Sequence, residues 1–131
     1  MNVVAGIEIA LGVPVDILGM PAVSTFPGFP RYWLPGAKWR HVEKLREDES
    51  IAISTLPILK QATQFLGVFF GVLRWLWNYR KLENRVVFVY ESYIPSLCGA
   101  SLACFALSAP MIVLIADPPG GATASRSLRG R

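Results

Sequence analysis

Residues 92–116 read SYIPSLCGASLACFALSAPMIVLIA, a run of 25 residues without a charged side chain. A helix needs roughly 20 apolar residues to cross about 30 Å of hydrocarbon, and a core helix or strand of a small domain does not need so long a stretch. The run therefore predicts a transmembrane helix. We expect Pro110 to kink this helix and the sequence DPPG at residues 117–120 to end it.

Residues 55–78 form a second apolar segment, TLPILKQATQFLGVFFGVLRWLWN. As a helix it would extend about 36 Å, and its two charges, Lys60 and Arg74, lie near its ends, from which their side chains can reach the membrane surfaces. We interpret this segment as a transmembrane helix. A re-entrant or interfacial helix is the alternative, because the uncharged stretch between the two charges has only 13 residues.

The segments around these two helices complete the predicted fold. Residues 79–91 are a basic connection and the start of the second helix, short enough to make the two helices an antiparallel hairpin. Residues 1–35 are apolar but broken by Gly and Pro, which argues against a third span and predicts an extension that lies against partners or the membrane interface. Residues 117–131 are expected to form a flexible basic tail.

Residues 36–50 have a different pattern. Trp39, Val42 and Leu45 recur every three residues, and most of the other positions are charged. This spacing predicts a short amphipathic surface helix. The predicted fold class is thus an all-α membrane protein: a two-helix transmembrane hairpin with an N-terminal extended segment, a surface helix and a basic C-terminal tail.

Small residues are spaced by four in both predicted membrane helices. Such rows let helix backbones approach closely in lipid, where packing drives helix association. Membrane helices are rich in small residues in any case, which is the alternative explanation. The predicted helix-packing residues are Thr63, Gly67 and Gly71 in the first helix and Ser96, Ala100, Cys104 and Ser108 in the second.

Basic and aromatic residues gather at the end of the first helix and just after it. Such a cluster suits an anionic lipid headgroup such as that of cardiolipin, with ordinary anchoring at the membrane surface as the alternative. A bound phospholipid is therefore a candidate ligand. The residues of this predicted lipid contact are Arg74, Trp75, Trp77, Tyr79, Arg80, Lys81 and Arg85.

The charge balance and the reactive residues indicate which functions to exclude. Thirteen Lys and Arg against nine Asp and Glu give a net charge of +4, but the basic residues lie at the ends of apolar segments, so we expect no nucleic-acid partner. His41 is the only histidine, and Cys98 and Cys104 point in different directions on a helix. We therefore expect no enzyme activity, no metal site, and no cofactor bound through the chain's own side chains.

A small hairpin with long tails is similar in general architecture to accessory subunits of respiratory complexes, ATP synthases and photosystems, which is an analogy and not a motif match. We favour an accessory (supernumerary) subunit of a mitochondrial respiratory-chain or ATP synthase complex in the inner membrane, which binds other membrane subunits and lipids and acts in assembly and stability. One alternative is a photosystem subunit in the thylakoid membrane. Another is a small self-assembling channel or transporter component, although Gln61, Thr63 and Gln64 place polar groups at only one end of the first helix.

Overall fold

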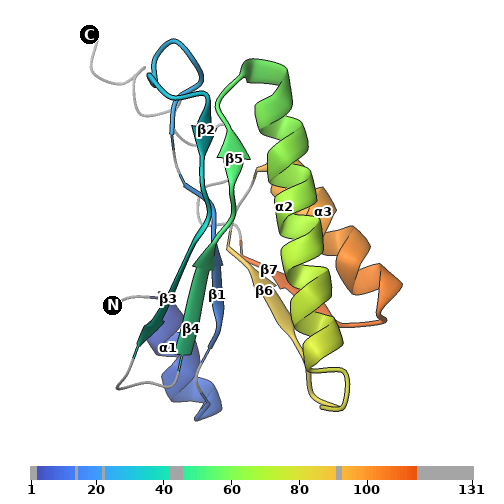
Figure 1. Cartoon of the computed structure of the whole chain (residues 1–131). Helices are drawn as coiled ribbons and strands as arrows, with labels where there is room; N and C mark the ends of the chain where they lie inside the picture. Colours follow the sequence, from blue (N-terminus) through green and yellow to red (C-terminus); the bar gives the residue numbers. More distant parts are fainter. Residues whose placement is uncertain (1–2, 14, 22, 42–45, 91–92, 115–131) are drawn as a thin grey trace, which may run out of the picture. The chain divides into compact units, whose positions relative to one another are not determined.

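The computed structural model describes residues 3–13, 15–21, 23–41, 46–90 and 93–114. These residues form three helices and seven short strands, drawn in Figure 1. The chain divides into two compact units, Met1–Gly67 and Val68–Arg131. The long helix α2 (Pro57–Asn78) contributes residues to both units. Each unit is described separately below.

The first unit is built on one antiparallel hairpin. Trp33 lies opposite Ser54 and His41 lies opposite Arg46, so the register is the same along the whole ladder. Pro35 has no N–H to donate, which interrupts the ladder in its middle. The outgoing arm consists of β2 (Trp33–Leu34) and β3 (Ala37–His41), and the returning arm of β4 (Arg46–Ser50) and β5 (Ile53–Ser54).

A third strand joins the hairpin from the N-terminal side. Strand β1 (Ile17–Gly19) pairs in parallel with β4, which gives a three-stranded sheet in the order β1-β4-β3. The short helix α1 (Val3–Leu11) precedes β1 and ends at Gly12, whose φ of 67° is favourable only for a residue without a Cβ.

The core of the first unit lies where the hairpin ends and α2 begins. Ile53 and Thr55 are fully buried, and Ile51 is 7% exposed. A Cβ added at Gly67 of α2 would lie 3.1 Å from the Ile51 side chain, so the absence of a side chain at Gly67 lets α2 approach the hairpin closely. The Lys60 ammonium group donates a 2.6 Å hydrogen bond to the Val23 carbonyl oxygen, and thus binds the protein instead of reaching toward a membrane surface.

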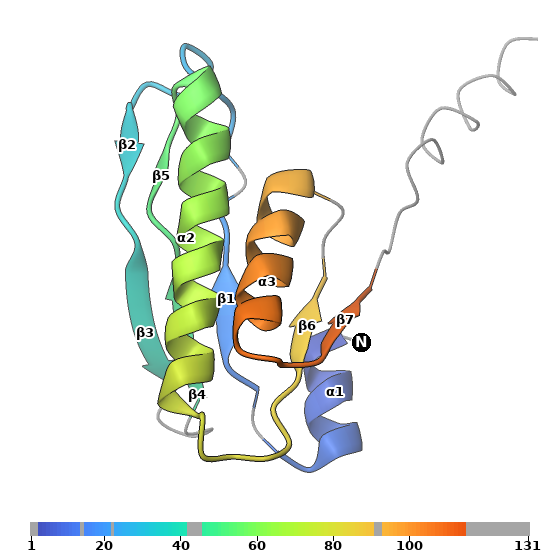
Figure 2. The same cartoon turned by 90° about the vertical axis from the view of Figure 1, so that its right-hand side faces the viewer.

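The second unit contains a β-α-β element. Strands β6 (Val87–Val89) and β7 (Met111–Val113) are parallel, with Val87 opposite Met111. Parallel neighbours need a crossover connection, and α3 (Ile94–Ala106) supplies it and lies against β6, as Figure 2 shows. The face of α3 that is buried consists of small residues, namely Ser96, Gly99, Ala100, Ala103 and Cys104.

Helix α3 ends because the backbone turns into the left-handed region at Ser108, where φ is 49°. The Ser108 N–H donates to the Phe105 carbonyl oxygen, and the Ala109 N–H donates to the Cys104 carbonyl oxygen. This pair of bonds is a Schellman motif, which satisfies the last carbonyls of a helix. Pro110 follows and cannot continue the helix. Pro110 was predicted to kink a longer helix, but α3 ends before it, at Ala106, and the chain forms strand β7 directly after the proline.

These elements contradict the predicted transmembrane hairpin. In the described part of the chain, no helix is both long enough and apolar enough to cross a membrane. Helix α3 has 13 residues, which corresponds to about 20 Å against the roughly 30 Å required. Helix α2 has 22 residues but includes two charges and three polar amide side chains. The all-α membrane fold class and the integral-membrane localisation, in mitochondria or thylakoids, are therefore wrong.

Two other predicted segments also differ from the structure. The expected surface helix at 36–50 is a strand pair, β3 and β4, because the pairing of each strand with its neighbour outweighs a weak helical spacing. The expected extended segment at 1–35 contains α1 and β1. The predicted tail at 117–131 lies outside the described residues.

Candidate functional site

The described residues bury few large apolar side chains and leave many exposed. Among the residues that the structure describes, the large hydrophobic side chains in the core are Ile51, Ile53, Val72 and Leu76, together with two alanines and a cysteine. Nineteen large hydrophobic residues are at least 38% exposed in the same part of the chain. Single exposed apolar residues are normal, but contiguous apolar patches mark surfaces that bind other molecules.

Four of the exposed side chains fall on one side of α2. Leu59 and Leu66 are 51% and 47% exposed, and Phe70 and Trp77 are 59% and 57% exposed. Their spacing of seven, four and seven residues puts them within an arc of about 40° on a helix with 100° per residue. We refer to these four residues as the outward apolar face of α2.

Part of the opposite side of α2 is buried. Gln64, Val72 and Leu76 are at most 8% exposed, and their helical positions lie on the far side from the outward apolar face. Helix α2 therefore has large apolar residues on two sides, and those of the outward apolar face are the exposed ones. A surface helix with a single partner would normally carry polar residues on its outer side.

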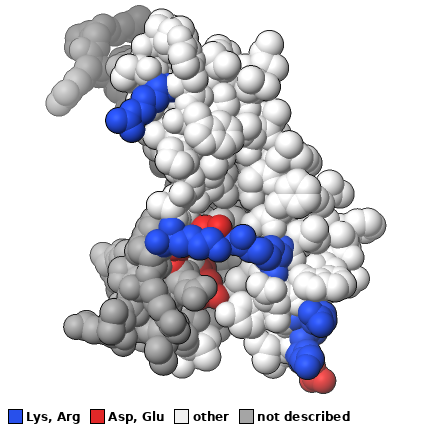
Figure 3. All heavy atoms as spheres, viewed as in Figure 1, with Lys and Arg blue, Asp and Glu red and all other residues white. Residues whose placement is uncertain are grey.

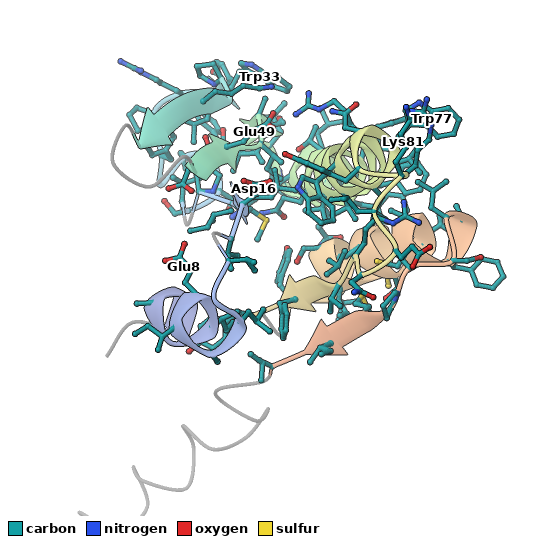
Figure 4. All side chains as sticks on the ribbon, turned by 90° about the horizontal axis from the view of Figure 1, so that it is seen from below. Glu8, Asp16, Trp33, Glu49, Trp77 and Lys81 are labelled. Carbon is teal, nitrogen blue, oxygen red and sulfur yellow. The ribbon has the colours of Figure 1, made fainter. Side chains whose placement is uncertain are left out.

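The charges around the outward apolar face are almost all positive. Helix α2 contains Lys60 and Arg74 and no acidic residue, and the turn after it contains Arg80, Lys81 and Glu83. In Figure 3 a cluster of basic side chains with one acidic neighbour lies at the lower right, over the end of α2. Figure 4 shows that Trp77 and Lys81 both project outward from this end of the helix.

Two arginines of the predicted lipid contact cap the C-terminus of α2. Arg85 Nη1 donates to the Leu76 carbonyl oxygen at 2.8 Å, and Arg80 Nη1 donates to the Trp77 carbonyl oxygen at 3.1 Å. Cations at this end of a helix satisfy its last carbonyls and interact favourably with the helix dipole.

The aromatic members of the same cluster also make contacts within the protein. The Arg80 guanidinium lies 5.0 Å from the centre of the Trp77 ring, a cation–π distance. The rings of Trp75 and Tyr79 are 5.1 Å apart. The structure thus brings most of the predicted lipid-contact residues together at the end of α2, and their binding of a lipid stays a prediction.

The predicted helix-packing residues of α2 make contacts in the first unit. The Thr63 hydroxyl accepts a 3.0 Å hydrogen bond from the Ser54 N–H and donates to the Leu59 carbonyl oxygen at 2.8 Å. Gly67 faces Ile51, which is a loop residue between two strands. Gly71 is partly buried in the second unit.

The predicted helix-packing residues of α3 are separated by the end of that helix. Ser96, Ala100 and Cys104 share its buried face, whereas Ser108 lies beyond the helix and is exposed. A role of the α2 and α3 residues in helix–helix packing stays a prediction.

The two cysteines differ in their exposure. Both are free thiols, with Cys98 exposed and Cys104 only 3% exposed. Burial raises the pKa of the Cys104 thiol, because an apolar environment disfavours the thiolate. In the described residues, no group of three or more His, Cys, Asp and Glu side chains could hold a metal ion.

The outward apolar face of α2 was not singled out by sequence reasoning. Its spacing is visible in the sequence, but an apolar outer side carries no special information when a helix is expected to be surrounded by lipid.

Comparison with known proteins gives no match: no family model, curated protein or solved structure shows significant similarity to this chain.

Proposed function

We propose that this protein is a non-catalytic accessory subunit of a multi-chain assembly, and that the outward apolar face of α2 binds a neighbouring polypeptide. The observation that carries this proposal is the exposure of Leu59, Leu66, Phe70 and Trp77 along one side of α2, whose buried residues lie on the opposite side. Proteins expose apolar residues in continuous stripes mainly where they bind something else.

The energetics of exposure support a protein partner. Burying a Leu or Phe side chain contributes roughly 1.5–3 kcal/mol relative to leaving it in water. Four such side chains in a row therefore represent a substantial driving force for association, although part of it is offset by the entropy lost on binding. Aromatic residues such as Trp77 are also enriched at the centres of protein interfaces.

The proposal is tested by the size of the native particle. The tagged full-length chain is expressed in its own cells, released by gentle lysis and separated by size-exclusion chromatography, with mass spectrometry of the fractions. We expect elution far above the chain's own 14.4 kDa, together with the same partner chains in each preparation. Elution of the bulk of the chain at its own mass would contradict the proposal.

Matched variants assign the assembly to the face. Leu66→Ser combined with Phe70→Ser should release the chain from the assembly, because both side chains lie on the outward apolar face of α2. Phe105→Ser is the control, because Phe105 is 84% exposed but lies on α3. We expect the control chain to stay in the assembly.

A further inference from the structure

Resting on the proposed function, we propose that the neighbouring polypeptide presents an acidic amphipathic helix to the second half of α2 and the turn after it. The docking surface lies within the second unit and consists of Phe70, Arg74, Trp77 and Lys81. All four are exposed. The proposal specifies both the shape of the partner segment, a helix, and its charge, which is negative.

The spacing of the two aromatic residues matches the repeat of a packed helix. Phe70 and Trp77 are seven residues apart, which is two helical turns or about 10.5 Å along the axis of α2. A partner helix with apolar residues at heptad spacing presents the same interval. Apolar side chains of the partner would therefore meet both rings in one register.

The charges along this surface are mostly positive, which favours an acidic partner. Arg74 lies four residues, or about one helical turn, after Phe70. Lys81 lies four residues after Trp77, in the turn that follows α2. The nearby turn adds Arg80 and Arg85, against a single acid, Glu83. A second copy of this chain would bring like charges together, which opposes association. Glutamates beside the apolar stripe of a partner helix would instead be attracted to this positive surface.

A protein helix also fits the arrangement better than a lipid headgroup. Arg80 and Arg85 each direct an N–H to a carbonyl oxygen at the end of α2, so these donors do not converge on an external phosphate. Arg74 and Lys81 are seven residues apart in the sequence, a heptad interval like that of the charges that flank a helix interface. A phosphate headgroup is typically held by donors that meet at one point.

The test uses purified full-length chain and labelled synthetic peptides. The probe is a three-heptad helical peptide with Leu at the core positions and Glu at the flanking positions. A control peptide has the same sequence with Lys in place of each Glu. Fluorescence anisotropy gives the two affinities. We expect the Glu peptide to bind at least about tenfold more tightly than the Lys peptide. Trp77→Ser should weaken Glu-peptide binding by about tenfold or more, and Arg74→Glu combined with Lys81→Glu should reverse the preference.

Two variants outside the surface serve as controls. Phe105→Ser removes an exposed ring from α3, and Arg31→Glu reverses an exposed charge in the first unit. Both should bind the Glu peptide within about twofold of the unchanged protein, since surface residues outside a contact contribute little. Circular dichroism of each variant checks that it is folded.

Three results of the binding experiment would overturn the acidic-helix assignment. One is equal binding of the two peptides, and another is an equal loss of binding in the control variants. The third is saturable binding to phosphatidylglycerol vesicles without binding of either peptide, which would assign the cations to a lipid headgroup. If the Trp77→Ser chain stays in the native assembly, the acidic-helix assignment fails while the proposed function stands. If the wild-type chain is monomeric in its cells, both the acidic-helix assignment and the proposed function fail.

Discussion

Gly36 lies between β2 and β3, against the backbone of the opposite arm of the hairpin. A Cβ at this position would be 2.6 Å from the Ser50 carbonyl oxygen and 3.1 Å from the Ala52 nitrogen. Neither backbone group can move without breaking the register of the strands. We predict that Gly36→Ala lowers the free energy of unfolding by about 1–3 kcal/mol, measured by urea denaturation.

Gly19 provides the control for this substitution. It also lies in a strand of the first unit, but a Cβ there would be 3.7 Å from the nearest atom, the Glu49 carbonyl oxygen. Gly19→Ala should therefore leave the free energy of unfolding within about 0.5 kcal/mol of the unchanged protein or raise it. Equal losses in the two variants would contradict the close approach at Gly36.

The two thiols should differ in their reaction with iodoacetamide. We predict fast alkylation of Cys98 and slow alkylation of Cys104 in the folded chain, because Cys104 is buried and its pKa is raised. Cys98→Ser and Cys104→Ala identify each phase, and both thiols should react quickly in urea. Two equal rates in the folded protein would show that the side of α3 that carries Cys104 is not covered by the rest of the chain.

The raised pKa of Cys104 also has a consequence for stability. The folded chain keeps this proton at a pH at which the unfolded chain's thiol, with an ordinary pKa of about 8.5, loses it. The unfolded state then binds fewer protons than the folded state, so the free energy of unfolding should fall as the pH rises above that value. Cys104→Ala should reduce this dependence.

At the scale of elements, the end of α3 depends on an unfavourable backbone conformation. Ser108 has a positive φ and an exposed side chain, and the left-handed region costs a residue with a Cβ roughly 1–2 kcal/mol. We predict that Ser108→Gly raises the free energy of unfolding by about 0.5–1 kcal/mol, because part of this gain is offset by the greater entropy of Gly in the unfolded chain.

Ser108→Ala is the matched variant, since it removes the hydroxyl but keeps the Cβ. It should leave the stability close to that of the unchanged protein. A gain with Ala equal to that with Gly would show that the hydroxyl, and not the backbone conformation, is responsible.

Helix α2 buries a polar group on its inner side. Gln64 is 3% exposed, and its Oε1 atom accepts no hydrogen bond from the described residues. An unsatisfied buried acceptor costs about 1–3 kcal/mol. We predict that Gln64→Met raises the midpoint of urea unfolding, whereas Gln61→Met, at an exposed position of the same helix, leaves it nearly unchanged. A loss of stability in Gln64→Met would indicate a partner for the amide.

The existence of α2 could be predicted from the sequence. The helix begins at Pro57, two residues after the predicted start at residue 55. The apolar run at 92–116 could not be assigned from its length, because a buried helix followed by a parallel strand is also continuously apolar. The signals that divide the run are local: Ser108 turns the backbone, Pro110 excludes further helix, and Met111–Val113 contains two β-branched residues.

For the whole molecule, the hydrophobic fraction of 53% is a surplus over the roughly 45–50% of an ordinary soluble domain. That surplus was assigned to lipid, whereas the structure places part of it in short strands and leaves another part exposed on α2. The basic residues near Trp77 are neighbours in the sequence, but the hydrogen bonds of Arg80 and Arg85 to the last carbonyls of α2 depend on the turn geometry. The sequence does not reveal this geometry.

The measurement that tests the central claim most directly is site-specific photocrosslinking in intact cells. A benzophenone amino acid placed at Leu66, on the outward apolar face of α2, should give a covalent adduct with another polypeptide. The same group at Gln61, an exposed position on another side of the helix, should give little or none. Adducts of equal yield at both positions, or none at Leu66, would contradict the claim that this face binds a neighbouring chain.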